Sequence, residues 1–215
     1  MKRYAVRTLG ETGPLFTLAP ERYRPVAGSH GVPLSALAEE VCGRVSLAAG
    51  QEGIVLDTTH VRDGTIRLPP LRRGGSPKTP VPGGSLLVSR LRPYLRQIGF
   101  VSESLFGEGG SDAKKAERTR ERPPLLCSTE FSVLVPKGPR SLAFLLPFLL
   151  SDEVQARLTA AQEGGHRPRV PRETLMTLRV PGSAVRARRK TSAAVEKALA
   201  ELYSAQFRWR NALGL

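Results

Sequence analysis

The stretch GSLLVSRLRPYLR, residues 84–96, decides the fold, because a short apolar run in it follows a Gly-Gly turn. The run from Ser85 to Arg90 is typical of a buried strand. Two further runs of this kind are QIGFVS at 97–102 and STEFSVLVP at 128–136. Pro93 lies between the first run and the second. The sequence therefore predicts a β-sheet at the centre of the protein.

Helical patterns lie on both sides of these strands. Residues 32–41 (VPLSALAEEV) place apolar side chains at helical spacing, and residues 141–150 form an apolar helical segment that Pro147 interrupts. A further helix is predicted at 152–161, because Ser151 can cap it and acidic residues occupy its first turn. Strands and helices together predict the fold class, a mixed α/β (α+β) domain.

Two shorter elements complete the expected domain. Residues 53–68 are rich in β-branched side chains around Asp63-Gly64, which predicts a β-hairpin. A short helix or turn is expected at 172–177 and a strand at 178–180, before Pro181-Gly182 marks a boundary. Residues 106–124 have dense charge of both signs and few apolar side chains, so we expect a long exposed loop there.

A long C-terminal α-helix is predicted over 185–213, which contains no Pro or Gly. At 1.5 Å per residue it would span roughly 43 Å. Its apolar positions alternate by four and three, the rhythm of a coiled coil: Val195, Leu199, Leu202, Gln206, Trp209 and Leu213. Two interpretations stay open, a helix that pairs two copies of the chain and a helix that folds back on its own domain. The predicted organisation is an N-terminal arm at 1–31, a central domain at 32–182 and this helix at 183–215.

The charge of the chain indicates a polyanionic partner. It carries 33 Lys and Arg against 19 Asp and Glu, a net charge of +14 with a pI near 10.8, and 40% of its residues are hydrophobic, as in a folded domain. The excess is rich in Arg, which suits bidentate contacts with phosphates and bases. Nucleic acid is favoured over an acidic membrane or protein. The alternative is a charged surface that serves solubility alone.

Several function classes are poorly supported. The three histidines are isolated from one another and from Cys42 and Cys127, so no familiar metal site or cysteine–histidine pair is predicted, and no cofactor is expected. Gly83-Gly84 precedes a strand instead of opening a helix, which fails the context of a phosphate-binding loop. The apolar run at 142–150 is too short to cross a bilayer. We expect a non-catalytic, reduced, cytoplasmic protein that is neither exported nor membrane-bound.

Three segments, taken in order, resemble the target recognition domain of type I restriction-modification specificity subunits. Residues 84–96 resemble the family's strand and its S-[KR]-[LI]-R-P-[YN]-L stretch, and residues 127–136 (CSTEFSVLVP) resemble its CSTEF-x-V-L-x-P strand. Residues 144–170 resemble its yFL-x-S-x-x-[VF]-Q helices and the G-T-x-x-P-x-V segment that follows, with Gly165 in place of Thr. Weaker likeness at 32–68 extends the resemblance to about Pro181.

The resemblance implies recognition of double-stranded DNA without catalysis, on behalf of a partner DNA methyltransferase and a nuclease-translocase. Family subunits carry two recognition domains separated by long helices, whereas this chain has one of each. It therefore looks like half a subunit, and a homodimer paired through the C-terminal helix would restore the two-fold arrangement. Residues 180–183 and the run RARRK at 186–190 depart from the family's methyltransferase-docking pattern.

The basic residues divide by expected role once duplex DNA is the partner. Phosphate contacts, which position the protein, are assigned to Arg72, Arg73, Lys78, Lys114, Lys115, Arg118 and Arg120. Contacts near base edges are assigned to Arg167 and Arg169, with Arg92 and Tyr94 beside them, and His166 is a further DNA-binding candidate. Arg90 and Glu130 are expected to be scaffold residues, with Arg90 in a salt bridge to Glu130 or another carboxylate. Two alternatives remain, the recognition component of another phage-defence system and a basic RNA- or ribosome-associated module.

Overall fold

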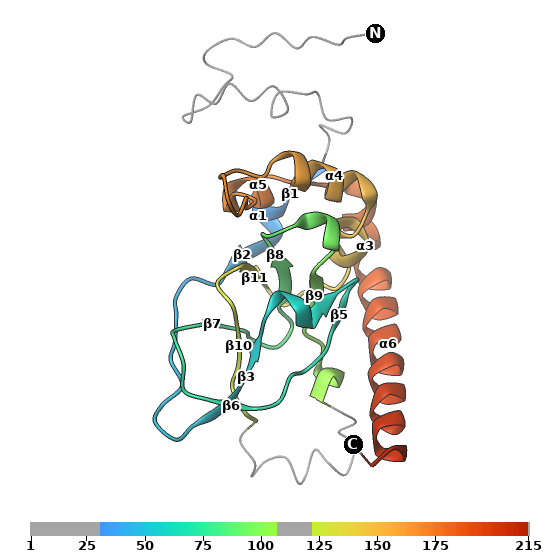
Figure 1. The fold of residues 1–215 in the computed structure, drawn as a ribbon. Coiled ribbons are helices and arrows are strands. Elements are labelled where there is room, and N and C mark those ends of the chain that lie inside the picture. The colour runs from blue at the N-terminus through green and yellow to red at the C-terminus, as the bar shows by residue number, and fades with distance from the viewer. Residues whose placement is uncertain (1–30, 107–121, 215) are drawn as a thin grey trace.

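The protein is built around a four-stranded antiparallel sheet (Figure 1). The computed structural model describes residues 31–106 and 122–214. The strand order is β2 (Ala38–Glu40), β11 (Phe131–Pro136), β8 (Leu86–Ser89) and β9 (Ile98–Phe100). Every residue of β8 and β9 is buried. The strands predicted at 85–90 and 97–102 are confirmed, and the one predicted from residue 128 begins at Phe131, because the Ser128 carbonyl accepts a hydrogen bond from the Phe131 amide in a turn.

A second sheet lies beside the first, in the order β6 (Arg72–Arg73), β3 (Glu52–Leu56), β10 (Leu125–Cys127) and β7 (Thr79–Pro80). β10 pairs parallel with β3 and antiparallel with β7. Cys127 is fully buried there, and burial raises the pKa of its thiol to about 12. A buried thiol with a raised pKa is not ionised at neutral pH, so this environment supports a structural role for Cys127.

The hairpin predicted at 53–68 is shorter than expected. β4 (Val61–Arg62) and β5 (Thr65–Ile66) pair antiparallel across Asp63-Gly64, both with positive φ, as a type I′ turn requires. The predicted first arm is instead β3, which pairs with β10 and β6, and the 3₁₀ helix η3 (Thr58–His60) separates it from β4.

The helix predicted at 32–41 is much shorter in the structure. Only α1 (Leu34–Leu37) is helical, between β1 (Gly31–Pro33) and β2. β1 pairs with β12 (Arg179–Pro181), and β2 pairs with β11. Hydrogen bonding to these distant strands outweighs the local helical spacing, since helix propensity is a weak preference.

Short helices lie at one end of the main sheet, α3 (Leu145–Leu149), α4 (Asp152–Ala160) and α5 (Arg172–Met176). The Ser151 hydroxyl accepts a hydrogen bond from the Val154 amide, so the predicted cap of the helix at 152–161 is confirmed. Two 3₁₀ helices, η4 (Pro93–Leu95) and η5 (Glu103–Phe106), flank β9.

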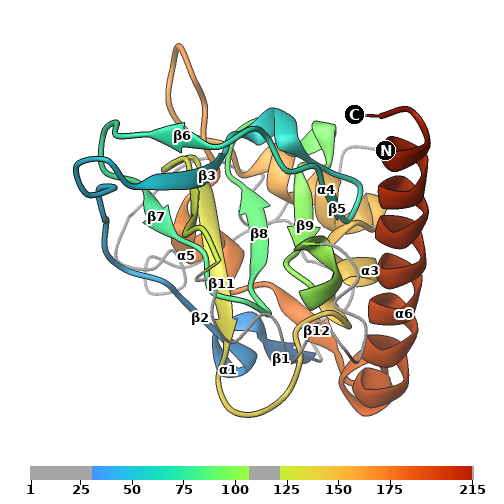
Figure 2. The same cartoon turned by 90° about the horizontal axis from the view of Figure 1, so that it is seen from below.

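The long C-terminal helix is confirmed as α6 (Gly182–Ala212), 31 residues that run along one side of the domain (Figures 1 and 2). Leu199 and Tyr203 are buried against the domain, and the Ile66 amide donates a 2.9 Å hydrogen bond to the Tyr203 hydroxyl. Residues up to Tyr203 therefore fold back on their own domain, while Leu202, Trp209 and Leu213 stay exposed. The mixed α/β class with a long C-terminal helix is confirmed, and none of the helices in the described ranges is long and apolar enough to cross a membrane.

Candidate nucleic-acid interface

One end of the main sheet gathers residues from three distant segments. β8 and β11 are antiparallel, so the chain after β8 meets the chain before β11, and the Arg90 amide donates to the Glu130 carbonyl at 2.9 Å. The loop 161–171 joins them, because the Val170 amide donates to the Arg90 carbonyl and Arg169 forms a β-bridge with Leu91. This end of the sheet fixes the loop at its C-terminal side.

Arg169 and Glu130 form a bidentate ion pair at this end of the sheet. Arg169 Nε donates to Glu130 Oε2 at 2.7 Å, and Nη2 donates to Oε1 at 2.6 Å. The hydrogen bond and charge of Arg169 hold the pKa of Glu130 below its ordinary value despite partial burial. The Glu130 side chain is 21% exposed and that of Arg169 is 41% exposed. The pair is therefore a fixed feature that remains open to solvent on the arginine side.

Arg90 does not form the salt bridge with Glu130 that was one of its two expected pairings. Glu130 is occupied by Arg169, and Arg90 Nη2 donates instead to the carbonyl of Thr129 at 3.2 Å. Burial lowers the pKa of Arg90, as do the nearby positive charges of Arg172 and Arg169, against the raising effect of Glu130 and Glu40. Its half-buried position agrees with a scaffold role for Arg90.

The loop 161–171 closes into a small hairpin. The Arg169 amide donates to the Glu163 carbonyl at 2.8 Å, and the Glu163 amide donates to the Arg169 carbonyl at 2.9 Å. Gly164 has φ of 101°, a conformation that favours glycine, so it turns the chain at the start of the tip. His166 and Arg167 lie exposed at this tip. The base of the hairpin is thus held on the sheet and its tip projects outward.

A second turn, around η4, lies against α4. Arg92 and Arg96 have positive φ of 44° and 50° on either side of η4, a strained backbone for residues with side chains. Arg96 donates to the Leu150 carbonyl and forms an ion pair with Asp152, which ties the turn to α3 and α4. Tyr94, 62% exposed, lies at the tip of this turn.

We call Arg92, Tyr94, Glu130, His166, Arg167 and Arg169 the ion-paired cluster. The five predicted members lie on two turns, and the Leu91–Arg169 and Arg90–Val170 backbone contacts join the bases of these turns at one end of the sheet. Glu130 is the member whose role the sequence missed. It lies 39 positions from Arg169 in the chain, so no local pattern relates the two residues.

The expected phosphate-contacting residues lie elsewhere. Arg72 and Arg73 form β6, where Arg73 pairs with Glu52 at 2.9 Å and Arg72 lies 4.0 Å from Asp57. Lys78 is at the opposite edge of that sheet, half-buried and bridged to Val45, so the structure does not bring it to Arg72 and Arg73. The remaining predicted residues lie outside the described residues: Lys114, Lys115, Arg118 and Arg120.

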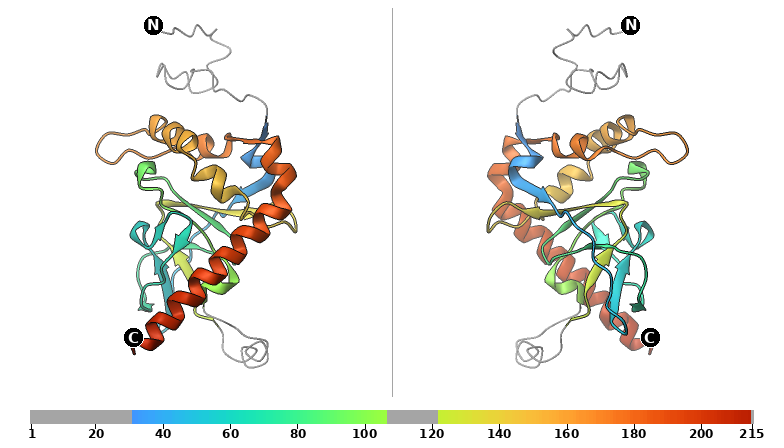
Figure 3. Two further views of the ribbon diagram at one scale, coloured as in Figure 1. Left: turned by 90° about the vertical axis from the view of Figure 1, so that its right-hand side faces the viewer. Right: turned by 90° about the vertical axis from the view of Figure 1, so that its left-hand side faces the viewer.

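The backbone segments that carry the ion-paired cluster lie on the same side of the domain as β6 (Figures 2 and 3). In Figure 3 the loop 161–171, η4 and the strands around β6 follow one another along one side, and Figure 2 shows β6 and the loop together at the top of the view. Within residues 31–106 and 122–214, no group of three His, Cys, Asp or Glu side chains is placed to hold a metal ion. The arrangement offers guanidinium groups and an exposed aromatic ring to a ligand.

Comparison with known proteins finds a likeness in structure but none to a family model or a curated protein. A solved chain matches with a TM-score of 0.54 and 19% sequence identity over 86% of this chain, in work described as "Structural basis underlying complex assembly and conformational transition of the type I R-M system". The two chains share a fold over this region. The present chain spans 45% of that R-M chain, less than half of its length.

Proposed function

We propose that this protein recognises a specific sequence in double-stranded DNA and acts as the single-domain counterpart of a type I R-M specificity subunit. In this role it is not an enzyme, and it directs a partner DNA methyltransferase or nuclease-translocase in the cytoplasm. The observation that carries the proposal is the Arg169–Glu130 ion pair beside the exposed tips at Arg167 and Tyr94. The shared fold with a type I R-M chain supports it.

The geometry of the ion pair suits base recognition. A guanidinium has five N–H donors, and Glu130 takes the edge formed by Nε and Nη2. The other edge, formed by Nη1 and the second hydrogen of Nη2, has only a 3.4 Å contact with the Arg167 carbonyl. Two parallel donors of this kind match O6 and N7 of guanine in the major groove. Glu130 thus holds Arg169 in the orientation that base reading needs.

Arg72 and Arg73 have the opposite character, because their side chains are mostly exposed and form only surface ion pairs. Such residues contribute attraction to phosphates that depends on salt and carries no sequence information. We assign them to positioning the duplex against the side of the domain that also bears the ion-paired cluster.

A second copy is part of the proposed assembly, because the resemblance implies two recognition domains in each subunit. Pairing through α6 stays a prediction. Of its six heptad positions, Leu199 is buried in its own domain, and Leu202, Trp209 and Leu213 are the exposed apolar ones. Sedimentation of the purified chain measures the oligomeric state directly.

The test of the proposal is competition binding. Anisotropy of a labelled 30-base-pair random duplex is measured with unlabelled duplex DNA and structured RNA as competitors, over a series of salt concentrations. We expect duplex DNA to compete better than RNA, and Arg167→Ala to weaken binding. Arg140→Ala is the matched control, because this exposed arginine lies beyond the far end of β11 from Glu130.

The outcome also separates the alternatives. Stronger competition by structured RNA would replace the proposal with an RNA- or ribosome-associated function. Duplex binding without recruitment of a type I methyltransferase would favour a second candidate, the DNA-recognition component of another phage-defence system. The RARRK run at 186–190 supports this candidate, because it departs from the family's methyltransferase-docking pattern.

A further inference from the structure

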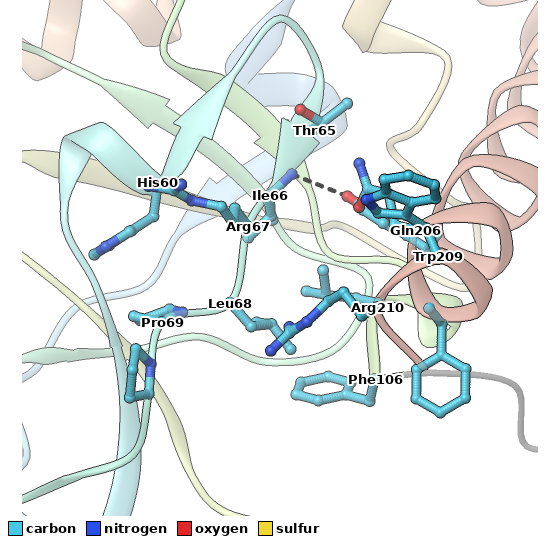
Figure 4. Close-up of a pocket in the computed structure, with 14 residues that line it drawn as sticks. His60, Thr65, Ile66, Arg67, Leu68, Pro69, Phe106, Gln206, Trp209 and Arg210 are labelled. Carbon is cyan, nitrogen blue, oxygen red and sulfur yellow. Dashed lines mark hydrogen bonds between the residues drawn. The ribbon is translucent and has the colours of Figure 1, made fainter. Parts of the chain in front are cut away.

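A groove of about 780 Å³ lies between the end of α6 and the chain that follows β5 (Figure 4). Its walls are Leu68 with Pro69 and Pro70 on one side, Phe106 at the end of η5, and Phe207 with Trp209 on α6. The hydrogen bond from the Ile66 amide to the Tyr203 hydroxyl closes its inner end. The groove is distinct from the ion-paired cluster, with which it shares no residue.

The apolar character of this groove is unusual for an exposed surface. Seven large hydrophobic side chains are exposed among the described residues, and four of them lie on the last three turns of α6 or directly after them: Leu202, Phe207, Trp209 and Leu213. Trp209 is 67% exposed and Phe207 is 49% exposed. Gathered apolar and aromatic side chains beside a groove mark a binding surface for protein, because water solvates them poorly.

The charges at the groove have a single sign. Arg67 and Arg210 line it, and no Asp or Glu is among its lining residues. A third guanidinium, that of Arg122, lies 5.4 Å from the centre of the Phe106 ring on its wall. A partner that fills this groove is therefore expected to carry negative charge around its apolar side chains.

We infer that the groove binds an acidic amphipathic helix of another protein. Apolar side chains spaced three and four residues apart would lie against Phe106, Phe207 and Trp209, with carboxylates at Arg67 and Arg210. A helix in a groove is a common mode of peptide recognition. The last three turns of α6 offer a wall for a partner helix of about three turns. The inference needs no DNA contact, so it goes beyond the proposed function.

Charge argues against a second copy as the occupant of this groove, so the predicted pairing through α6 is left with the exposed positions outside the groove, Leu202 and Leu213. Between residues 182 and 212, α6 carries seven Lys and Arg and two Glu. A second α6 in the groove would bring the Arg210 of one copy towards the Arg67 of the other, and like charges placed together disfavour binding. DNA is also disfavoured, because the lining between Arg67 and Arg210 is mostly apolar and offers few donors to phosphates.

Trp209 is the single tryptophan of the chain and lies in the groove, so its fluorescence reports occupancy directly. The full-length protein is titrated with eighteen-residue helical peptides that carry Leu or Phe at heptad a and d positions and Glu elsewhere. A matched set carries Lys in place of Glu. We expect the acidic set to shift the Trp209 emission to shorter wavelength and to reduce its quenching by acrylamide, and the basic set to do neither.

Charge reversal makes the test specific. The double variant Arg67→Glu, Arg210→Glu should bind the acidic peptides at least about tenfold more weakly, and Arg189→Glu, on the same helix but outside the groove, should bind them as the native chain does. Circular dichroism confirms that each variant is folded. The inference is overturned by no response to acidic peptides, by an equal response to the two sets, or by Trp209 already protected from acrylamide in the free chain. It is equally overturned by a shift that grows with protein concentration alone, or by protection by a 30-base-pair duplex.

Discussion

The ion-paired cluster and β6 present arginines on the same side of the domain but hold them in different ways. Arg169 is fixed by two hydrogen bonds to Glu130, by backbone hydrogen bonds to Glu163 and by its β-bridge with Leu91. Arg72 and Arg73 project from a two-residue edge strand and meet carboxylates at the surface. A fixed guanidinium can discriminate bases, whereas a mobile one can only add attraction to phosphates. The comparison predicts that substitutions in the two regions change different properties of DNA binding.

The largest effect is expected at Arg169. Arg169→Ala should weaken binding to the preferred duplex by between about 5-fold and about 100-fold, the range for removal of one bidentate pairing with a base. Binding to random duplex should change much less, and isothermal titration with both DNAs measures the difference. Equal losses of affinity on both DNAs would make Arg169 a phosphate-binding residue, like Arg72 and Arg73 on β6.

Glu130→Gln should have a smaller effect of the same kind. The amide keeps the shape of the side chain but cannot accept both hydrogen bonds of Arg169, so Arg169 loses its orientation while its charge remains. The same titrations on the double variant Arg169→Ala, Glu130→Gln should give no further loss beyond Arg169→Ala. Additive losses would show that Glu130 acts independently of Arg169.

Substitutions on β6 should change the salt dependence instead. Arg72→Ala with Arg73→Ala should reduce the slope of log binding constant against log salt by about one for each phosphate that the variant no longer neutralises. The preference for one sequence over another should be retained. An unchanged slope, measured by anisotropy between low and high salt, would remove β6 from the interface, and Arg140→Ala is the control for a surface charge.

The smallest expected effect is a pH dependence of stability that belongs to the ion-paired cluster. Arg169 lowers the pKa of Glu130 from its ordinary value of 4.5, so the unfolded chain takes up a proton at higher pH than the folded chain does. The stability from this pair is complete above pH 4.5 and is lost as the pH falls below it through the lowered pKa. The free energy of unfolding in urea, measured from pH 6 to pH 3, should therefore fall less steeply for Glu130→Gln than for the native chain. Parallel curves would mean that the pair adds nothing to folding.

Local patterns predicted those parts of the fold in which local signals and tertiary contacts agree. β8, β9, α4 and α6 fall within a few residues of their predicted ranges, since an apolar run, a cap or a helix-forming composition defines each one. The helix predicted at 32–41 was wrong because β1 pairs with β12 and β2 pairs with β11. Both partner strands lie more than ninety positions away in the chain. Pairing at such distances leaves no periodic signal.

The candidate site was predicted as a set of residues but not as an arrangement. Charge and resemblance pointed to Arg167, Arg169 and Tyr94, and the structure gathers them at one end of the main sheet. The partner of Arg169 could not be read from sequence, because Arg90 is as plausible a partner for Glu130 and backbone pairing already joins those two residues. Only the docking of the loop 161–171 decides between the two arginines.

Selection from a random duplex library tests the central claim most directly. The purified chain is incubated with 30-base-pair duplexes of random sequence, bound DNA is recovered and amplified over several rounds, and the enriched sequences are read. We predict that the native chain enriches one short motif, that Arg169→Ala loses preference at a single guanine of that motif, and that the Arg72→Ala, Arg73→Ala variant enriches the same motif. Recovery of unrelated sequences by the native chain would contradict the account.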